Sequence, residues 1–358
     1  MPRRIGIINS GGDCPGLNTV IDAIVKSLSV DYEILGFYKG FEGLLDLKYI
    51  KLEPEYTSVL KFQGGTFLKS VNKGHFAGKT GNGEFQELDK DILKQTVNNY
   101  KDLDLEALIV LGGDGTMSAA IQLQNIGINI IAVPKSIDND LEGTDFTFGF
   151  NTAVEITSEA LDRISTTAKS HDRIMILEVM GRNTGWIALY SGLSGGADMI
   201  LIPEIPFNQQ NVVDFFRQQY NAGHTYGLIV VAEGAVDVSG HVTTKNAGSK
   251  ASMVSLGGIG EHIEVLLNSQ PDLEARCTVL GHLQRGGSPN SWDRILSRSY
   301  GAYAGTMVRN KQYGYMVGYI NGSFTQTKLE DCIDNLKKVN PDGNFVKRAR
   351  ELGVSFGD

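Results

Sequence analysis

Cysteine is scarce in this chain of 358 residues, which has three: Cys14, Cys277 and Cys332. A disulfide framework needs an even and denser set, and a zinc site needs closely spaced pairs, so the sequence favours neither. So few cysteines are typical of a reducing compartment. No apolar run approaches the roughly 20 residues that cross a bilayer, and the amino-terminal segment lacks the apolar stretch of a signal peptide. We therefore expect a cytoplasmic protein without a membrane partner.

Positive charge is also in short supply. The chain has 33 lysines and arginines against 41 acidic residues, a formal net charge of −8, which argues against a general surface for nucleic acid. No arginine lies between Arg4 and Arg163, whereas several follow in the second half. Because the planar guanidinium suits a bidentate grip on a terminal phosphate, we expect a phosphorylated acceptor on the second half and its donor on the first.

Strand, glycine-rich turn and helix alternate along the chain. A strand at 5–8 leads through "NSGGDCPG" into a helix on which apolar residues recur with helical period from Leu17 to Leu28. A second strand at 107–111, the turn "GGDGT" and a helix ending near Gly127 repeat the scheme. Further strands are predicted at 128–134, 173–180, 199–203 and 226–234, a helix at about 151–169, and a surface loop at 238–252. The pattern indicates an α/β fold with mostly parallel sheets covered on both faces.

Charged residues gather where these strands end. In parallel sheets ligands bind outside the carboxyl ends of the strands, and there lie both Gly-Gly-Asp turns and the segment "PKSIDND" (134–140). In an extended segment Asp138 and Asp140 would face the same side. The alternative is a turn in which these side chains bond nearby backbone N–H groups. On the first interpretation Asp114 and Asp140 share a Mg²⁺, mostly through water, and Asp138 is free to act as a base.

Phosphoryl transfer suits this set of residues, because such enzymes mainly position the reactants and neutralise charge on the moving group. Downstream, "RCTVLGHLQRGGSP" sets Arg276, His282 and Arg285 around an apolar strand and a glycine turn. This arrangement is typical of a phosphate cradle.

The chain as a whole resembles the 6-phosphofructokinases (phosphofructokinase A), whose members use ATP or pyrophosphate. The motifs "GGDCPGLN", "GGTFLKS", "GGDGT", "PKSIDND", "MGR", "AEG" and "GHLQRGGSP" occur in the family's order over almost the whole length. The resemblance implies two Rossmann-like lobes with the active site in the cleft between them. Residues 1–139 and about 284–334 would form the donor lobe, and 140–283 and about 335–358 the fructose 6-phosphate lobe.

The resemblance also implies an activity and its residues. A terminal phosphoryl group would pass, with Mg²⁺, to the 1-hydroxyl of fructose 6-phosphate, giving fructose 1,6-bisphosphate in glycolysis. The catalytic positions would be Asp138 as proton acceptor, Ser136 beside it and Arg182. Both Ser136 and Asp138 would also contact the sugar phosphate, together with Arg173, Met180, Gly181, Arg182, Glu233, Arg276, His282 and Arg285. Because Arg173 and Arg276 match arginines that reach the 6-phosphate from a neighbouring subunit, a homo-oligomer is implied, a tetramer or a dimer.

The donor depends on a few positions in the first half. Residues matching the family's donor site are Gly12, Phe41, Asn72, Lys73, Gly113, Asp114, Gly115, Thr116 and Lys135. Pyrophosphate-using relatives resemble "GGDD" followed by "PK", whereas ATP-using ones commonly have "GGDG" followed by "PG". This chain pairs Gly115 with Lys135. Because the missing side chain at Gly115 leaves room for an inner phosphate, we expect a nucleotide, with ATP first.

Alternatives remain open on the same residues. Many ATP-using relatives have an arginine where this chain has Asn72, so ADP or pyrophosphate could be the donor. A regulatory member of the family without turnover is a second alternative, against which the retained Asp138, Asp140, Asp114 and Arg182 argue. A third is another "GGDG" kinase, acting on a lipid or dinucleotide, which predicts neither "PKSIDND" nor the downstream cradle.

Overall fold

The chain forms two compact units. The computed structural model describes residues 3–71, 74–79, 84–239, 257–333 and 336–358, so Asn72, Lys73 and most of the predicted loop 238–252 lie outside the described residues. One unit consists of Met1–Ile137, Leu141–Thr152 and Arg285–Leu336, and the other of Asp138–Asp140, Ala153–Gln284 and Lys337–Asp358. We call them unit 1 and unit 2. Their assignment to donor and acceptor stays a prediction.

Unit 1 is built on a mixed sheet. Among the described residues the sheet has eight strands in the order β12-β11-β5-β4-β1-β2-β3, with β6 paired to β5. The pairs from β11 to β2 are parallel, and the outer pairs β2–β3 and β11–β12 are antiparallel. The strands are β1 (Arg3–Asn9), β2 (Tyr32–Phe37), β3 (Tyr49–Leu52), β4 (Leu105–Gly112), β5 (Ile130–Ser136), β6 (Phe148–Gly149), β11 (Tyr315–Ile320) and β12 (Ser323–Lys328).

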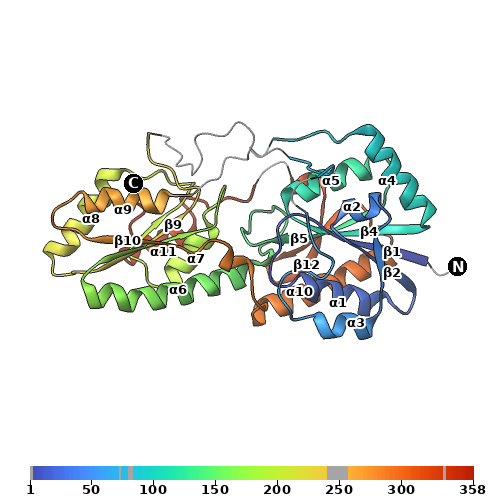
Figure 1. Cartoon of the computed structure of the whole chain (residues 1–358), viewed down its shortest axis with the longest axis horizontal. Coiled ribbons are helices and arrows are strands. Elements are labelled where there is room, and N and C mark those ends of the chain that lie inside the picture. The colour runs from blue at the N-terminus through green and yellow to red at the C-terminus, as the bar shows by residue number, and fades with distance from the viewer. Residues whose placement is uncertain (1–2, 72–73, 80–83, 240–256, 334–335) are drawn as a thin grey trace. The chain divides into compact units, whose positions relative to one another are not determined.

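Helices cover both faces of this sheet (Figure 1). On one side lie α1 (Leu17–Leu28), α3 (Pro54–Leu60) and α10 (Ser291–Arg309), and on the other α2 (Phe41–Leu45), α4 (Lys90–Asp102) and α5 (Asp114–Gln124), with the short helix η2 at Glu330–Cys332. The helix predicted from the periodicity between Leu17 and Leu28 is confirmed with the same bounds. Residues 107–111 of β4 are wholly buried, because a central strand covered on both faces has no polar side.

Unit 2 has a smaller sheet of parallel strands in the order β10-β7-β9-β8. Its strands are β7 (Ile174–Val179), β8 (Met199–Leu201), β9 (Gly227–Ala232) and β10 (Ala275–Val279). Its helices are α6 (Phe150–His171, which starts in unit 1), α7 (Trp186–Ser194), α8 (Gln209–Asn221), α9 (Ile259–Asn268), η1 (Gly281–Arg285) and α11 (Asn344–Glu351). Met199 and Leu201 share a core with α8 and α9, whereas Ile200 lies against Gly192 of α7.

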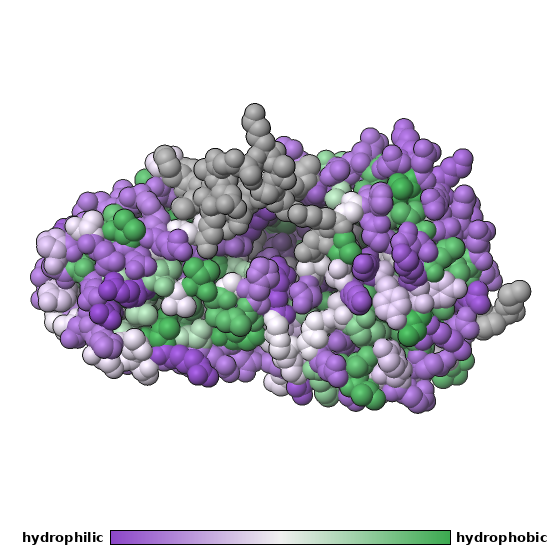
Figure 2. All heavy atoms as spheres, in the orientation of Figure 1, coloured by the Kyte–Doolittle hydropathy of each residue, from purple (hydrophilic) through white to green (hydrophobic). Residues whose placement is uncertain are grey.

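The predicted fold class is therefore confirmed: the protein is α/β with two mostly parallel sheets. Side chains follow the strand and helix periods, so apolar residues fill the interior of each unit. On the face drawn in Figure 2, hydrophilic residues predominate over both units and hydrophobic ones form smaller patches. Within the described ranges, no helix is long and apolar enough to cross a membrane.

A buried carboxylate fixes the start of α10 against the loop that opens α6. Asp293 is fully buried, and its Oδ1 accepts from the backbone N–H of Gly149 at 3.0 Å. Its Oδ2 accepts from the N–H of Thr152 at 2.7 Å and from the Thr152 hydroxyl at 2.6 Å. Buried N–H groups that lose their acceptor are costly, so this carboxylate holds together two segments that are more than 140 residues apart in sequence.

We expect Asp293→Ala to lower the free energy of unfolding by about 2–4 kcal/mol, because it leaves buried donors without an acceptor. Asp293→Asn keeps one acceptor oxygen and should lose less. Urea denaturation measures both, with Asp162→Ala on the exposed side of α6 as a control that should change little. An Asp293→Ala protein as stable as the wild type would contradict this role.

Candidate active site

The first glycine turn follows β1 and carries two cations on its backbone. The Lys135 ammonium donates to the carbonyl of Gly12 at 2.6 Å, and Nη1 of Arg285 donates to the carbonyl of Asp13 at 3.1 Å. A Cβ at Gly12 would lie 2.6 Å from Nη1 of Arg285, so the guanidinium can approach because residue 12 is glycine. Lys135 is only 5% exposed. The side chains of Lys135 and Arg285 thus place positive charge at the carboxyl end of β1, although the turn itself contains no arginine.

Cys14, in the same turn, has an unreactive thiol. Its side chain is fully buried, and burial raises the pKa of the thiol to about 12. The reactive form of cysteine is the thiolate, so Cys14 stays protonated and packs as a small apolar residue.

The second glycine turn joins β4 to α5. Gly113 caps the helix with extended backbone, and Asp114 is its first residue, where a carboxylate is favoured by the helix dipole. At Gly112 a Cβ would collide with Thr116 at 2.3 Å, which explains that glycine by packing alone. At Gly115, by contrast, a Cβ would meet no described atom within 4 Å. The space beside Gly115 is open, so packing within the fold does not explain why this residue lacks a side chain.

Sequence reasoning missed Lys79 at this turn. Its ammonium lies 2.6 Å from Oδ1 of Asp114, and the two side chains are 16% and 19% exposed. The chain reaches this position because Gly78 packs against the first turn of α5, where a Cβ would lie 2.7 Å from the carbonyl of Gly115. No motif includes Lys79, and only its lysine identity in an arginine-free stretch could have drawn notice.

The segment after β5 is a turn, which corrects one sequence argument. The strand runs through Lys135 to Ser136, and Asn139 then has φ +52, a left-handed conformation. Asp138 and Asp140 therefore do not follow the i, i+2 rule of an extended segment, and the turn interpretation of the backbone was correct. Within unit 2 the hydroxyl of Thr184 donates to the carbonyl of Asp138 at 3.2 Å, and Lys337 donates to Oδ1 of Asn139 at 2.9 Å.

Two loops of unit 2 bring together the predicted sugar-phosphate residues Met180, Gly181, Arg182 and Glu233. The backbone N–H of Glu233 donates to the carbonyl of Val179 at 2.8 Å. The backbone N–H of Gly234 donates to the carbonyl of Gly181 at 3.1 Å. This approach needs a glycine at position 234, where a Cβ would lie 2.0 Å from the carbonyl of Arg182. Both Arg182 and Glu233 are partly exposed at the carboxyl ends of β7 and β9.

The short helix η1 joins the same group through a residue that sequence reasoning missed. Gln284 is fully buried, and its Oε1 accepts from the N–H of Met180 at 3.3 Å. This contact ties η1, on which His282 is exposed, to the end of β7. Arg285 follows directly, but its guanidinium lies on the turn of unit 1 described above.

Arg173 and Arg276 lie at the opposite end of the unit 2 sheet, where β7 and β10 begin. Both guanidinium groups contact the carboxylate of Glu274, each at 2.8 Å. The hydrogen bond from Arg173, and then the charges of both arginines, lower the pKa of Glu274 below its ordinary value. The carboxylate is therefore ionised at neutral pH and neutralises part of the arginine charge.

The predicted metal ligands belong to different units, Asp114 to unit 1 and Asp140 to unit 2. Both are partly exposed carboxylates, the hard oxygen donors that Mg²⁺ prefers. Asp114 already holds a cation, the ammonium of Lys79. Each carboxylate by itself suits a magnesium ion, which keeps most of its other ligands as water or phosphate oxygens. In the described part of the chain, no group of three or more His, Cys, Asp or Glu side chains could hold a metal ion.

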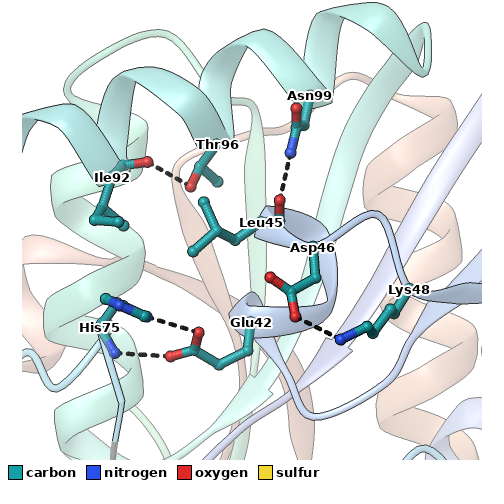
Figure 3. Close-up of polar contacts among 8 residues, drawn as sticks. All are labelled: Glu42, Leu45, Asp46, Lys48, His75, Ile92, Thr96 and Asn99. Carbon is teal, nitrogen blue, oxygen red and sulfur yellow. Dashed lines mark hydrogen bonds and ion pairs between the residues drawn. The ribbon is translucent and has the colours of Figure 1, made fainter.

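Figure 3 shows how α2 holds the segment that leads to Lys79. Oε1 of Glu42 accepts from the backbone N–H of His75 at 2.7 Å, and Oε2 lies 3.0 Å from Nδ1 of its ring. Beside this clamp the ring of Phe41, 1% exposed, packs on Phe76 with centroids 5.2 Å apart. Phe41 is thus a core residue, and its predicted place near the donor stays a prediction.

Comparisons with known proteins agree on one family. A family model described as "Phosphofructokinase" matches residues 4–308. An ATP-dependent 6-phosphofructokinase of Chloroflexus aurantiacus is 46% identical over 360 residues, covering 99% of this chain and 98% of the relative. ATP-dependent 6-phosphofructokinase 2 of Clostridium perfringens is 43% identical over 363 residues, covering 99% of both chains. The structure of phosphofructokinase from Saccharomyces cerevisiae matches 92% of this chain with TM-score 0.76 and 28% identity, and this chain spans 45% of that one.

The clamp between Glu42 and His75 should depend on pH. The hydrogen bond to Glu42 and the negative charge of its carboxylate raise the pKa of His75 above the ordinary 6.5. The contact therefore stabilises the fold fully below about pH 6.5, and this stabilisation is lost as the pH rises through the folded-state pKa of His75. An NMR titration should give a His75 pKa above 6.5 in the wild type and one near 6.5 in Glu42→Gln. His224, on a loop far along the chain, serves as the control, and equal His75 values in both proteins would refute the clamp.

Proposed function

The chain belongs to the phosphofructokinase family, and we propose that it acts as an ATP-dependent 6-phosphofructokinase through the residues described above. The observation that carries the proposal is near-full-length identity of 43% and 46% to two ATP-dependent 6-phosphofructokinases, combined with this chain's own motif residues at the carboxyl ends of the strands. The reaction moves the terminal phosphoryl group of ATP to the 1-hydroxyl of fructose 6-phosphate. The products are ADP and fructose 1,6-bisphosphate, as in glycolysis.

Asp138 is the residue we assign to the acceptor hydroxyl. The oxygen of the 1-hydroxyl forms the new bond to phosphorus, the bond between phosphorus and the ADP oxygen breaks, and the hydroxyl proton passes to the Asp138 carboxylate. The contacts around it support this role, because Thr184 donates to the carbonyl of Asp138 and Lys337 donates to the side chain of Asn139, the next residue. Ser136 ends the strand that leads into this turn.

The donor is held by unit 1. Its phosphates meet the N–H groups at the start of α5, the hydroxyl of Thr116 and the ammonium groups of Lys135 and Lys79. These lysines supply the charge that an arginine supplies in other members. The open space beside Gly115 supports ATP over pyrophosphate, since nothing there blocks the inner phosphates of a nucleotide. Of the other predicted donor residues, Gly12 and Gly113 belong to the two glycine turns, and Asn72 and Lys73 fall outside the described residues.

Asp114 and Asp140 are the residues that would hold Mg²⁺, which neutralises charge on the donor phosphates when it is bound. Before then the Lys79 ammonium keeps the Asp114 carboxylate in place. Among the acceptor residues, Arg182 is assigned to the transferred group and the 6-phosphate side, with Met180, Gly181, Glu233 and His282 around the sugar.

The assembly and location follow from the sequence predictions. We propose a homo-oligomer, a tetramer or a dimer, in which Arg173 and Arg276 reach the 6-phosphate of a neighbouring copy. Both side chains are partly exposed, 29% and 47%, which leaves them accessible to a phosphate. The cytoplasmic location predicted from the sequence is part of the same proposal.

The decisive measurement is the initial rate of fructose 1,6-bisphosphate formation from fructose 6-phosphate and Mg²⁺, with ATP, ADP or pyrophosphate as sole donor. We expect ATP to give the highest kcat/KM by at least about tenfold, the discrimination that one well-fitted contact provides. A preference for pyrophosphate would overturn the interpretation of Gly115. No activity with any donor would favour a regulatory member of the family.

Asp138→Asn should keep the fold and the affinity for fructose 6-phosphate while kcat falls by about 10²-fold to 10⁴-fold, because the amide cannot accept the hydroxyl proton. Asp145→Asn changes the same group in a neighbouring loop and is the control. Binding of fructose 6-phosphate by calorimetry separates lost chemistry from lost substrate. A variant that retains near-normal kcat would mean that another residue is the base.

A further inference from the structure

Two arginines and a glutamate form a cluster where β7 and β10 begin. Oε1 of Glu274 accepts from Nη2 of Arg173 and from Nη2 of Arg276, both at 2.8 Å. The strands pair in parallel with Ala275 opposite Ile174, so the residues that precede them lie side by side. One carboxylate oxygen thus draws two guanidinium groups together within unit 2.

Two guanidinium groups that donate to one carboxylate oxygen are also arranged to donate to a phosphate oxygen. The side chains of Arg173, Glu274 and Arg276 are 29%, 45% and 47% exposed, so a solute can reach them. The pairing with Glu274 also leaves a donor unused, because Nε of Arg173 is buried and has no hydrogen-bond partner among the described residues. The glutamate therefore satisfies the arginines incompletely. A phosphate monoester carries more charge and more acceptor oxygens than this carboxylate for the same two guanidinium groups.

We propose that Glu274 is an internal competitor of the substrate phosphate, an affinity-setting residue that occupies the arginine pair until a phosphate monoester displaces it. The inference rests on the proposed function and adds to it a residue that none of the motifs quoted above includes. It holds whether the phosphate belongs to a substrate on the same chain or on a neighbouring copy. Glu274 touches no reacting atom and is not a catalytic residue.

The competition predicts which kinetic constant changes. The 6-phosphate is present in the substrate, in the transition state and in the product, so a group that competes with it acts on all three alike. Removing the negative charge should therefore lower KM for fructose 6-phosphate and leave kcat unchanged or slightly lower through slower product release. Because the contact is exposed, added salt should weaken the effect.

Glu274→Gln tests the proposal, because glutamine keeps the shape and the acceptor oxygen but loses the charge. We expect KM for fructose 6-phosphate to fall about fivefold at low salt, the size of one exposed charge pair, with kcat within about twofold of the wild type. The calorimetric Kd for fructose 6-phosphate without donor should fall by the same factor, and Kd for inorganic phosphate should also fall. All three differences should shrink in 0.5 M KCl, because the Debye screening length there is only about 4 Å.

Two controls make the outcome specific. Glu261→Gln removes the same charge from the exposed start of α9 and should leave KM unchanged. Glu274→Asp keeps the charge on a shorter stem, and its KM should stay closer to the wild type than that of Glu274→Gln. An unchanged or raised KM in Glu274→Gln, with an active wild type, would overturn the competition, because the glutamate would then organise the arginines for the substrate. A wild type without 6-phosphofructokinase activity would instead overturn the proposed function.

Discussion

The parallel register of β1, β4 and β5 is the constraint on which the two glycine turns of unit 1 depend. Ile7 pairs with Ile109, and Gly112 pairs with Pro134, so all three strands end along the same edge of the sheet. Three loops from distant parts of the sequence therefore emerge beside one another: the turn after β1, the start of α5 and the end of β5. The ammonium of Lys135 can reach the carbonyl of Gly12 because of this alignment.

Lysines supply much of the positive charge at the glycine turns of unit 1, because no arginine lies between Arg4 and Arg163. Lys79 holds Asp114, Lys135 holds the turn after β1, and the nearest guanidinium on that turn comes from Arg285, far along the chain. Lysine places a compact charge at the end of a flexible stem, whereas arginine offers a rigid fork. Such flexible charges would suit the proposed donor, whose polyphosphate chain has several oxygens in a row rather than one terminal group.

Unit 2 uses the opposite chemistry, with arginines held in place by anions or backbone. Glu274 binds two of them, and both guanidinium groups lower the pKa of its carboxyl. The loops around Arg182 and Glu233 are fixed by backbone hydrogen bonds that require glycine at position 234. These residues thus have preset positions within unit 2, and the proposed competition would be between Glu274 and the substrate phosphate.

The sequence by itself determined the α/β class, the bounds of α1 and the places of the main strands, although not their exact ends. Buried strands and amphipathic helices leave local periodic patterns, which is why these features could be predicted. It misjudged the turn at Asn139, where a left-handed residue breaks the alternation assumed for a strand. The contacts of Lys79, Gln284 and Glu274 were decided by the tertiary structure alone. Each of these contacts joins residues that strand pairing or loop packing brings together. The local periodicity of a sequence does not show which distant side chain a given residue will contact.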